Sequence, residues 1–513
     1  MSGLFTVKRF DIDLGKYQVV LHDKDAEELG VHSQDRVKVG KNGDMVTAIV
    51  DTTDTAVEPG TAGVFVELQT RLDLQDGDQL KIQPADKPAS IHHIRKKMRG
   101  GELSSDEIDQ LVRDIVDGDI SDIELSSWVT AVEIRDMTMR ETVDLTKSMV
   151  KYGETIEFEG QQVFDKHSIG GVPGNKITLL VVPIVAAAGL LIPKTSSRAV
   201  TGAAGTADIM ECFGPVTLTG EEIKRITLEH GGVMCWGGGV NLAPADDIII
   251  RVEHPLGLDP RAQLLASVMA KKKAVGAQHC VIDLPTGDGT KLPNPDAARK
   301  IAREFIELGD ALGMRVECAL TYGGQPVGKT VGPALEGNEA LLALRGDPLA
   351  PGSFIEKSTV IAGILLEMGG VASRGKGKRR AEEILASGEA HNKFWEIVKA
   401  QGGKEVKQLE VGRFQASVVS MEEGYVTGIG NKTLVNLARL CGAPKDKGAG
   451  LVIHKTSGDK VGLDEPLVTL YAESEFKLKT ALAHAKKFPP VRISGMLLQR
   501  IPEIRELGDL VRV

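Results

Sequence analysis

The stretch KTSSRAVTGAAGTADIME, Lys194–Glu211, consists mostly of small residues around one arginine and one aspartate ten positions apart. Its serines and threonines are hydrogen-bond donors, and Arg198 can hold a carboxylate or a phosphate with two parallel hydrogen bonds. The glycines and alanines let a ligand lie against the backbone. This composition predicts either the floor of a site for an anionic small molecule or a helix packed closely on a sheet.

The chain around this stretch alternates between β-type and α-type patterns. Short apolar runs bounded by turns are separated by longer segments with the apolar period of a helix. We expect the apolar run Ile177–Ile192 to form a buried strand followed by a helix. The pattern predicts an α/β domain with a mainly parallel or mixed sheet over residues 160–250 and 277–345. The expected strands are QQVFDKH (161–167), KITLLVV (176–182), VMCWG (233–237), HCVIDLP (279–285) and RVECALT (315–321).

Three further regions flank this α/β domain. Residues 1–86 alternate short β-rich runs with polar turns, which predicts a small N-terminal β-barrel domain. Residues 91–155 have the period of amphipathic helices, and we expect residues 251–276 to join this helical domain. Residues 346–513 form a C-terminal α/β part that contains a β-rich module.

The composition is typical of a globular protein in a reducing compartment. The 513 residues carry a formal net charge of −9, whereas proteins that bind nucleic acids or membrane surfaces need a basic face. The longest apolar run is too short and interrupted for a membrane span. The five cysteines are scattered, so we expect no metal site and a cytoplasmic location. The expected partners are small-molecule substrates, and neither nucleic acid nor a membrane.

A second loop of small residues, DKHSIGGVPGNKIT, precedes the first one. Lys166, Ser168 and Thr178 can converge on an anion, while the glycine pair offers open backbone N–H groups. The spacing alone fits an ordinary tight turn equally well. Two such loops in one α/β domain favour a ligand site at the carboxyl ends of the strands.

Three later segments carry further candidates. In LGLDPRAQLLASVMAKKKA, Asp259 can cap a helix, and Ser267 and Lys271 share one of its faces. A simple cap and a solvated lysine are the plainer interpretations of Asp259 and Lys271. Lys291, in LPTGDGTK, can meet another anionic group. Gly323–Thr330 matches the P-loop pattern, but the glycine and proline that follow would break the required helix, so we interpret the match as chance.

The stretch Ser196–Glu211 resembles the signature of the thymidine and pyrimidine nucleoside phosphorylases, a serine–arginine start followed by GT-x-D-x-x-E. DKHSIGGV is similar to the phosphate loop of that family, and Ile94–Val150 is similar to its N-terminal helical domain. The resemblance covers residues 91–490. The chain departs from the family's bacterial enzymes by its additional N-terminal domain, and Arg251 stands out of register with the arginine that reads a pyrimidine.

The NLAPADDI and SSRAVT segments make the sequence most similar to the archaeal branch of this family. That branch implies a helical domain with a large α/β domain, as in type II nucleoside phosphorylases. It implies the reaction of AMP with phosphate to give adenine and α-D-ribose 1,5-bisphosphate, with other nucleoside 5′-monophosphates as further substrates. Inorganic phosphate is then a co-substrate, no cofactor is expected, and the assembly is a homodimer or larger homo-oligomer. Uridine and thymidine remain the alternative substrates.

By the same resemblance, Asp259 is the candidate general acid that protonates a ring nitrogen of the leaving purine. Burial would have to raise the pKa of its carboxyl group. The resemblance places Lys166 and Ser168 on the inorganic phosphate, where the chemistry of the loop adds Thr178, and it places Lys271 on the base side. The residues assigned to the nucleotide are Gly171, Ser197, Arg198, Ala199, Val200, Thr201, Gly202, Thr206, Ser267 and Lys291.

Two functions from other classes fit parts of the pattern. A phosphoribosyltransferase of the anthranilate type shares this architecture but would need a divalent cation. Asp246 and Asp247 are the nearest acidic pair for such an ion, and we interpret both as ordinary loop acids. A non-catalytic nucleotide-binding scaffold, assembled through the N-terminal β-domain, would bind nucleotide without releasing base.

Overall fold

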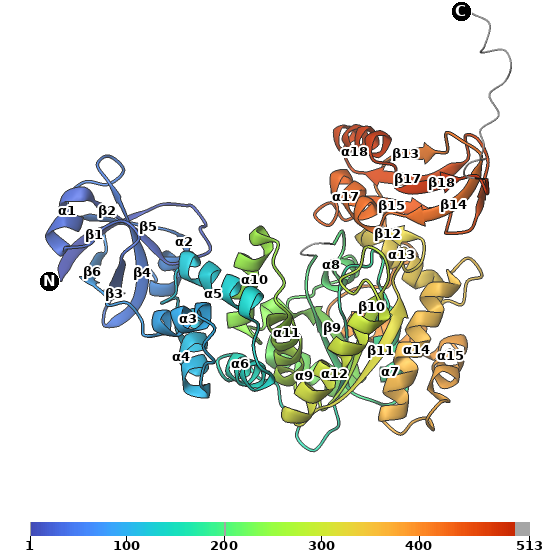
Figure 1. The fold of residues 1–513 in the computed structure, drawn as a ribbon, viewed down its shortest axis with the longest axis horizontal. Coiled ribbons are helices and arrows are strands. Elements are labelled where there is room, and N and C mark those ends of the chain that lie inside the picture. The colour runs from blue at the N-terminus through green and yellow to red at the C-terminus, as the bar shows by residue number, and fades with distance from the viewer. Residues whose placement is uncertain (1, 200–201, 498–513) are drawn as a thin grey trace, which may run out of the picture. The chain divides into compact units, whose positions relative to one another are not determined.

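The computed structural model describes residues 2–199 and 202–497, and the chain divides into two compact units (Figure 1). The first unit contains Met1–Glu154 and Leu242–Ala270, and the second contains Thr155–Asn241 and Lys271–Val513. The chain therefore leaves the first unit once and returns to it for a single short segment.

A closed six-stranded β-barrel begins the first unit. In barrel order its strands are β1 (Gly3–Arg9), β5 (Thr61–Val64), β2 (Gln18–His22), β4 (Asp44–Thr53), β3 (Arg36–Lys41) and β6 (Gln79–Pro84), and its helices are α1 (Asp23–Leu29) and α2 (Val66–Leu72). Alternate side chains along the strands face inward, so that Phe5, Val7 and Val37 share one core. The β3–β4 hairpin turns at Asn42 and Gly43, both of which have a positive φ, as tight hairpin loops require.

Amphipathic helices make up the rest of the first unit. They are α3 (Ser90–Met98), α4 (Ser105–Val116), α5 (Asp122–Arg135), α6 (Met139–Lys151), α10 (Pro244–Leu256) and α11 (Arg261–Ala274). α4, α5 and α6 each begin with a capping box, at Ser104, Ser121 and Thr138. Their apolar faces, together with those of α10 and α11, bury Trp128 to 1% exposure.

A parallel sheet forms the centre of the second unit. Its strands are β7 (Phe164–Ser168), β8 (Ile192–Ser196), β9 (Gly232–Trp236), β10 (His279–Thr286) and β11 (Arg315–Tyr322). β10 lies between β7 and β11, β8 pairs with β9, and a parallel bridge between Val163 and Leu191 joins the two groups.

Helices surround this sheet and supply most of its apolar core. They are α7 (Thr178–Ala187), α8 (Thr206–Met210), α9 (Gly220–His230), α12 (Pro295–Ala311), α13 (Pro333–Leu344), α14 (Gly352–Met368), α15 (Gly377–Ala386) and α16 (Glu389–Ala400), with a 3₁₀ turn, η1 (Gly237–Gly239). Parallel strands need crossover connections, and helices on the faces of the sheet provide them.

The segment KITLLVV, which we expected to be a strand, belongs mainly to helix α7. The apolar run Ile177–Ile192 therefore holds a helix followed by the start of β8, the reverse of the expected order. Thr178–Ala186 is buried along its whole length, so the helix has no polar face and the sequence shows no helical period. A short apolar run of this kind does not distinguish a buried helix from a buried strand.

A β-rich module ends the described chain. One sheet contains, in order, β12 (Thr330–Val331), β15 (Gly450–Ile453), β17 (Pro466–Ala472) and β13 (Phe414–Val419), and the other contains β16 (Lys460–Val461), β14 (Gly424–Ile429) and β18 (Val491–Ser494). The helices α17 (Asn431–Cys441) and α18 (Glu475–Lys487) share its core. β12 leads into α13 yet pairs with β15, so the module is joined to the α/β part through a common sheet.

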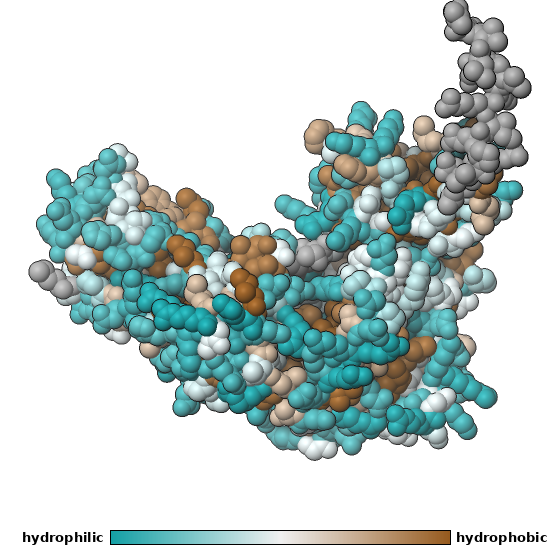
Figure 2. Space-filling model, in the orientation of Figure 1, coloured by the Kyte–Doolittle hydropathy of each residue, from teal (hydrophilic) through white to brown (hydrophobic). Residues whose placement is uncertain are grey.

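The visible surface is largely hydrophilic, with separate apolar patches (Figure 2). Large apolar side chains are exposed at Ile123, Ile134 and Phe476, among others. Within the described residues, no helix combines the length and the apolar character that crossing a membrane requires.

A buried ion pair in the helical part of the first unit gives a stability prediction. Lys97 Nζ donates to both carboxylate oxygens of Glu141, each at 2.9 Å, and the side chains are 5% and 0% exposed. The substitution Lys97→Met leaves a buried carboxylate without its cation, so we expect the free energy of unfolding to fall by about 3–5 kcal/mol. Urea denaturation followed by circular dichroism measures the loss.

The neighbouring Lys96 provides the control. Its Nζ lies 2.7 Å from Glu107, but the lysine side chain is 44% exposed. We expect Lys96→Met to cost at most about 1 kcal/mol, because solvent screens exposed ion pairs. Equal losses in the two variants would contradict the assignment of Lys97 and Glu141 as a buried pair.

Candidate active site

The candidate residues of the second unit cluster where the parallel strands end. β7, β8, β9, β10 and β11 finish at Ser168, Ser196, Trp236, Thr286 and Tyr322. Since the strands are parallel, the loops that follow them emerge at the same edge of the sheet. Ligands of open α/β sheets bind at this edge.

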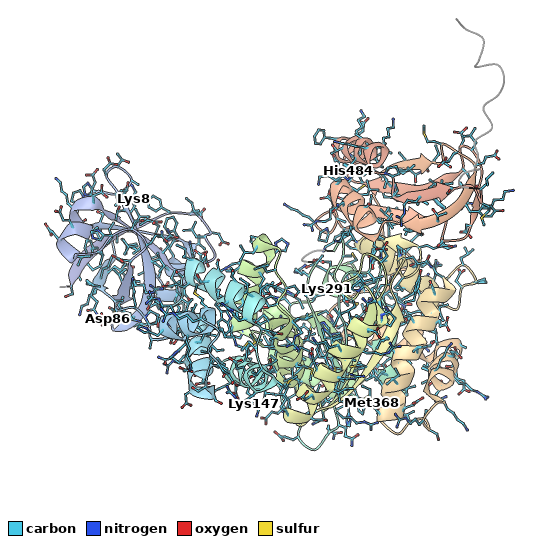
Figure 3. The ribbon with its side chains drawn as sticks, in the orientation of Figure 1. Lys8, Asp86, Lys147, Lys291, Met368 and His484 are labelled. Atoms are coloured by element: carbon cyan, nitrogen blue, oxygen red, sulfur yellow. The ribbon has the colours of Figure 1, made fainter. Side chains whose placement is uncertain are left out.

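The end of β7 and the loops after β7 and β10 bring four predicted residues together in two pairs. Lys166 Nζ lies 3.3 Å from Ser168 Oγ. Gly171 has a φ of +106°, and a Cβ at this position would lie 3.3 Å from the backbone nitrogen of Lys291. Lys291 lies in the loop after β10 (Figure 3). Glycine is therefore needed at position 171 both for its backbone conformation and for the close approach of the second loop.

Arg198, which we expected to clamp a ligand, forms its bidentate ion pair with Glu211. Nη1 lies 2.7 Å from Oε2 and Nη2 lies 2.6 Å from Oε1. Nη1 is also 3.4 Å from Asp208 Oδ1, and the guanidinium lies over the Trp236 ring at 5.0 Å. The arginine and Lys447 hold the pKa of Glu211 at about 2, although partial burial opposes them. The guanidinium side chain is nevertheless 36% exposed and faces solvent in part.

Asp208 folds the small-residue loop around Arg198. One of its carboxylate oxygens accepts from the backbone N–H of Ala199 at 2.7 Å and from that of Gly205 at 2.9 Å. A Cβ at Gly205 would lie 2.5 Å from the carbonyl oxygen of Ser197. The small residues therefore let the loop close on itself. Ser197 is exposed and Gly202 half-buried, while Val200 and Thr201 lie outside the described residues.

Two predicted threonines meet at helix starts. Thr206 begins α8, Thr178 begins α7, and their hydroxyl oxygens are 3.5 Å apart. The first turn of a helix has backbone N–H groups without helical partners and a positive dipole end, which attract anions. α7 has ten residues and α8 has five, so the N-terminus of α7 has the larger helix dipole and is the better anion site of the two.

Four buried lysines lie beneath these loops. They are Lys166, Lys194, Lys272 and Lys357, each 8% exposed or less. Asp165, which is fully buried, lies 2.7 Å from Lys272 Nζ and 3.6 Å from Lys194 Nζ. Asp283, also fully buried, lies 3.0 Å from Lys357 Nζ and accepts a 2.5 Å hydrogen bond from Thr321. Four cations therefore share two carboxylates, and the imbalance favours an anionic ligand.

Burial and the neighbouring charges shift the pKa values of this cluster. Burial lowers the pKa of Lys166 to about 8 against the attraction of Asp283, and it lowers that of Lys194 to about 7. Burial also disfavours the charge of Lys272, but the attraction of Asp165 outweighs it and raises the pKa. Burial and the surrounding lysines, Lys271 among them, keep the pKa of His167 well below its usual value. Lys272 therefore keeps its charge beside Asp165, whereas a bound anion would favour the charged forms of Lys166 and Lys194.

Two predicted residues belong to the first unit. Asp259 lies exposed just before α11, so the burial expected for its carboxyl group is not found in this structure. Ser267 Oγ, on α11, donates to Asp246 at 2.8 Å. Asp246 and Asp247 lie in the first turn of α10, and the expectation of loop acids was wrong. Asp246 is fully buried, and Ser267 and Gln263 donate hydrogen bonds to its carboxylate.

The P-loop pattern at Gly323–Thr330 does not form a phosphate cradle. α13 begins at Pro333, four residues after Lys329, and the backbone N–H of Lys329 donates to Glu339. The proline and the preceding glycine delay the helix, as the sequence indicates.

Several residues of the site were missed or misread from the sequence. Lys272 looked like part of a solvated lysine run, yet it is 2% exposed. It follows the buried Leu265 and Val268 by seven and four residues, so the helical period of α11 could have indicated its inward position. Lys194 begins the small-residue stretch, but no spacing indicates that it meets Asp165.

Known proteins resemble nearly the whole chain. The helical bundle domain of a glycosyl transferase family matches residues 91–153, the a/b domain of that family matches residues 160–391, and the pyrimidine nucleoside phosphorylase C-terminal domain matches residues 425–490. The AMP phosphorylase of Methanococcoides burtonii is 51% identical over 98% of this chain and 99% of its own. The chain belongs to the AMP phosphorylase family.

Other members and a solved structure agree with this assignment. The AMP phosphorylase of Methanothrix thermoacetophila is 50% identical over 98% of this chain and 99% of its own, and AMP phosphorylase 1 of Archaeoglobus fulgidus is 50% identical over 97% and 98%. The anthranilate phosphoribosyltransferase of Thermus thermophilus has the same fold, with a TM-score of 0.50 and 20% identity over 60% of this chain and 99% of its own. The predicted family and fold class are confirmed, and the alignments with the AMP phosphorylases extend over the N-terminal barrel.

The lysine cluster gives a prediction for pH dependence. Lys166 has a pKa of about 8, so it loses its positive charge as the pH rises through that value. We expect the KM for inorganic phosphate to rise roughly tenfold between pH 7.5 and 9. Initial rates at saturating nucleotide over this range measure the effect.

The variant Lys166→Arg separates this lysine from other titrating groups. Arginine keeps its charge throughout this range, so the rise in KM should flatten even if the absolute KM increases. A wild-type KM that does not change with pH would contradict the assignment of Lys166 to the phosphate.

Proposed function

We propose that the protein phosphorolyses AMP, and other nucleoside 5′-monophosphates, to the free base and α-D-ribose 1,5-bisphosphate. The observation that carries this proposal is the surplus of buried positive charge at the carboxyl edge of the sheet, beside the N-terminus of α7. The reaction brings together two phosphates, the attacking one and the 5′-phosphate of the nucleotide. Relatives at about half identity over nearly their whole length are named AMP phosphorylases.

In this mechanism inorganic phosphate attacks C1 of the ribose while the bond to the base breaks. Lys166, Ser168 and Thr178 hold the attacking phosphate. Their fixed positive field stabilises the transition state, since oriented charge contacts in a dry site are worth roughly 3 kcal/mol each. Phosphate is consumed as a co-substrate, and the scheme uses no cofactor.

The leaving base needs a proton, because it otherwise departs as an anion. Asp259 is the proposed general acid, with a purine ring nitrogen as the acceptor. Its carboxyl group is exposed in this structure, so the bound base itself must exclude water from the carboxyl group. Ser267 and Lys271 belong to the helix that follows Asp259, and we assign them to the nucleotide and to the base side.

The remaining contacts surround the nucleotide. Arg198 lies in the loop after β8, and Gly171, Thr206 and Lys291 also lie beyond strand ends at this edge of the sheet. We assign these four residues to the nucleotide, together with Ser197, Ala199, Val200, Thr201 and Gly202. Their hydroxyl, backbone N–H and cationic groups suit the 5′-phosphate and the ribose.

We further propose a cytoplasmic location and a homodimer or larger homo-oligomer. All five cysteines are free thiols, as is usual in a reducing compartment. Gel filtration with light scattering would determine the assembly.

Base release is the direct test of the proposed reaction. We expect phosphate-dependent release of adenine from AMP, without added metal, and at least tenfold lower kcat/KM for adenosine, uridine and thymidine. Chromatography of the free bases measures each rate. The C-terminal match to pyrimidine nucleoside phosphorylases makes uridine and thymidine the important comparison substrates. Faster release from these nucleosides than from AMP would overturn the proposal.

The general acid has its own test. The substitution Asp259→Asn removes the transferable proton while preserving size, so we expect kcat for AMP to fall by about 10²–10⁴-fold with little change in KM. Asp296→Asn serves as the control, because this 93%-exposed residue pairs only with its helix neighbour Arg299 among the contacts described. Equal activity of both variants would remove Asp259 from the mechanism.

A further inference from the structure

Lys447 connects the C-terminal module to the Arg198 loop. It lies between α17 and β15, and its Nζ is 2.7 Å from Oε2 of Glu211 and 3.6 Å from Oδ1 of Asp208. These carboxylates also hold Arg198. Two cations from distant parts of the sequence therefore share two carboxylates.

The backbone of Lys447 is fixed independently of Arg198. Its carbonyl oxygen accepts a 3.0 Å hydrogen bond from the backbone N–H of Ala334, in the first turn of α13. The next residue, Gly448, donates from its backbone to Glu473 Oε1 at 3.0 Å. The backbone of Lys447 is therefore held in a position from which its ammonium group reaches Glu211.

The bidentate pair between Arg198 and Glu211 competes with any ligand for the same guanidinium edge. Nη1 and Nη2 both face the carboxylate, at 2.7 and 2.6 Å. A phosphate that takes this edge must displace Glu211, which would then keep a negative charge at a half-buried position. If Arg198 were the only cation beside Glu211, its departure would leave an unpaired charge at this half-buried position, which costs free energy.

Lys447 removes that cost. It already contacts the oxygen of Glu211 that Nη1 binds, so the carboxylate keeps a cation when Arg198 turns away. The Trp236 ring, 5.0 Å from the guanidinium carbon, still supports the arginine during the exchange. The side chains of Arg198, Glu211 and Lys447 are 36%, 34% and 34% exposed, which leaves them room to move.

We infer that Lys447 is a positioning residue for nucleotide binding: it neutralises Glu211 and Asp208 while Arg198 exchanges Glu211 for the 5′-phosphate of the substrate. The inference rests on the proposed function, which supplies the nucleotide. It gives the C-terminal module a direct part in substrate binding, through a residue that touches no substrate atom.

Kinetics of Lys447→Met test the exchange. Without Lys447, Arg198 is held more firmly by Glu211, so we expect the KM for AMP to rise about tenfold while kcat and the KM for inorganic phosphate stay within about twofold. Lys447→Arg keeps the charge and should restore most of the affinity. The control is Lys477→Met, on α18. This substitution removes a 2.5 Å ion pair to Asp446, the neighbour of Lys447 in the chain, and does not change the contacts of Glu211.

A double-mutant cycle with Glu211→Gln separates the exchange from simple loop support. The neutral amide no longer competes for Arg198, so Lys447→Met should change the KM for AMP by less than about twofold in this background. An undiminished tenfold effect would show that Lys447 acts without Glu211 and would overturn the inference. An unchanged KM in the single variant, with the protein folded by circular dichroism, would overturn it as well.

Calorimetric titration with AMP keeps the inference independent of turnover. If the wild type binds AMP but releases no adenine, the proposed reaction fails, while weaker AMP binding by Lys447→Met still supports the exchange. If Lys447→Met does not fold, the comparison of Glu211→Gln with the double variant Glu211→Gln/Lys447→Gln decides: equal affinities support the exchange, and a tenfold difference contradicts it.

Discussion

The buried surplus of positive charge beneath the strand ends is the constraint on which the second unit depends. Ionised groups inside a protein are normally paired, and within the part of the chain that the structure describes two buried carboxylates, Asp165 and Asp283, lie among four buried lysines. The carboxylates sit on neighbouring strands, β7 and β10, whose parallel register fixes them rigidly. The lysines come from β7, β8, α11 and α14, so the sheet and its helices must pack correctly before the charges meet. The positive groups that can attract an anion are therefore part of the buried core of this unit.

The same requirement explains the composition of the loop after β8. Arg198 can only be held by Glu211 and Asp208 if the chain turns back within a few residues, and Asp208 achieves this by binding two backbone N–H groups. Gly205 lies too close to Ser197 for a larger residue. The small residues that suggest a ligand floor also let the loop fold over its own ion pairs. The structure thus gives the small residues a role in folding the loop, and their role as a ligand floor stays a prediction.

How far the sequence predicts this structure depends on whether a residue's partner is near in the chain. Capping boxes at Ser104 and Thr138 and the Asn42-Gly43 hairpin are local, and patterns of a few residues specify them. The contact between Lys166 and Ser168 is equally local. The pairing of Lys194 with Asp165, or of Lys447 with Glu211, joins residues far apart, and no local pattern encodes it. The α7 error has a related cause, because complete burial removes the periodicity that identifies a helix.

The two kinds of cation suit the two tasks of the proposed reaction. The buried lysines are shielded from solvent, so their field on a reacting phosphate is weakly screened. Burial lowers the pKa of Lys166 and Lys194, and a bound anion would favour their charged forms. Arg198 stays charged at every relevant pH and is partly exposed, which fits a contact that must form and break. The product of the proposed reaction carries both phosphates and must still leave. An internal competitor such as Glu211 helps here, since its return to Arg198 replaces the departing phosphate and limits how tightly the product is held. The ion pair that opposes binding is then the one that promotes release, and Lys447 keeps that competition balanced.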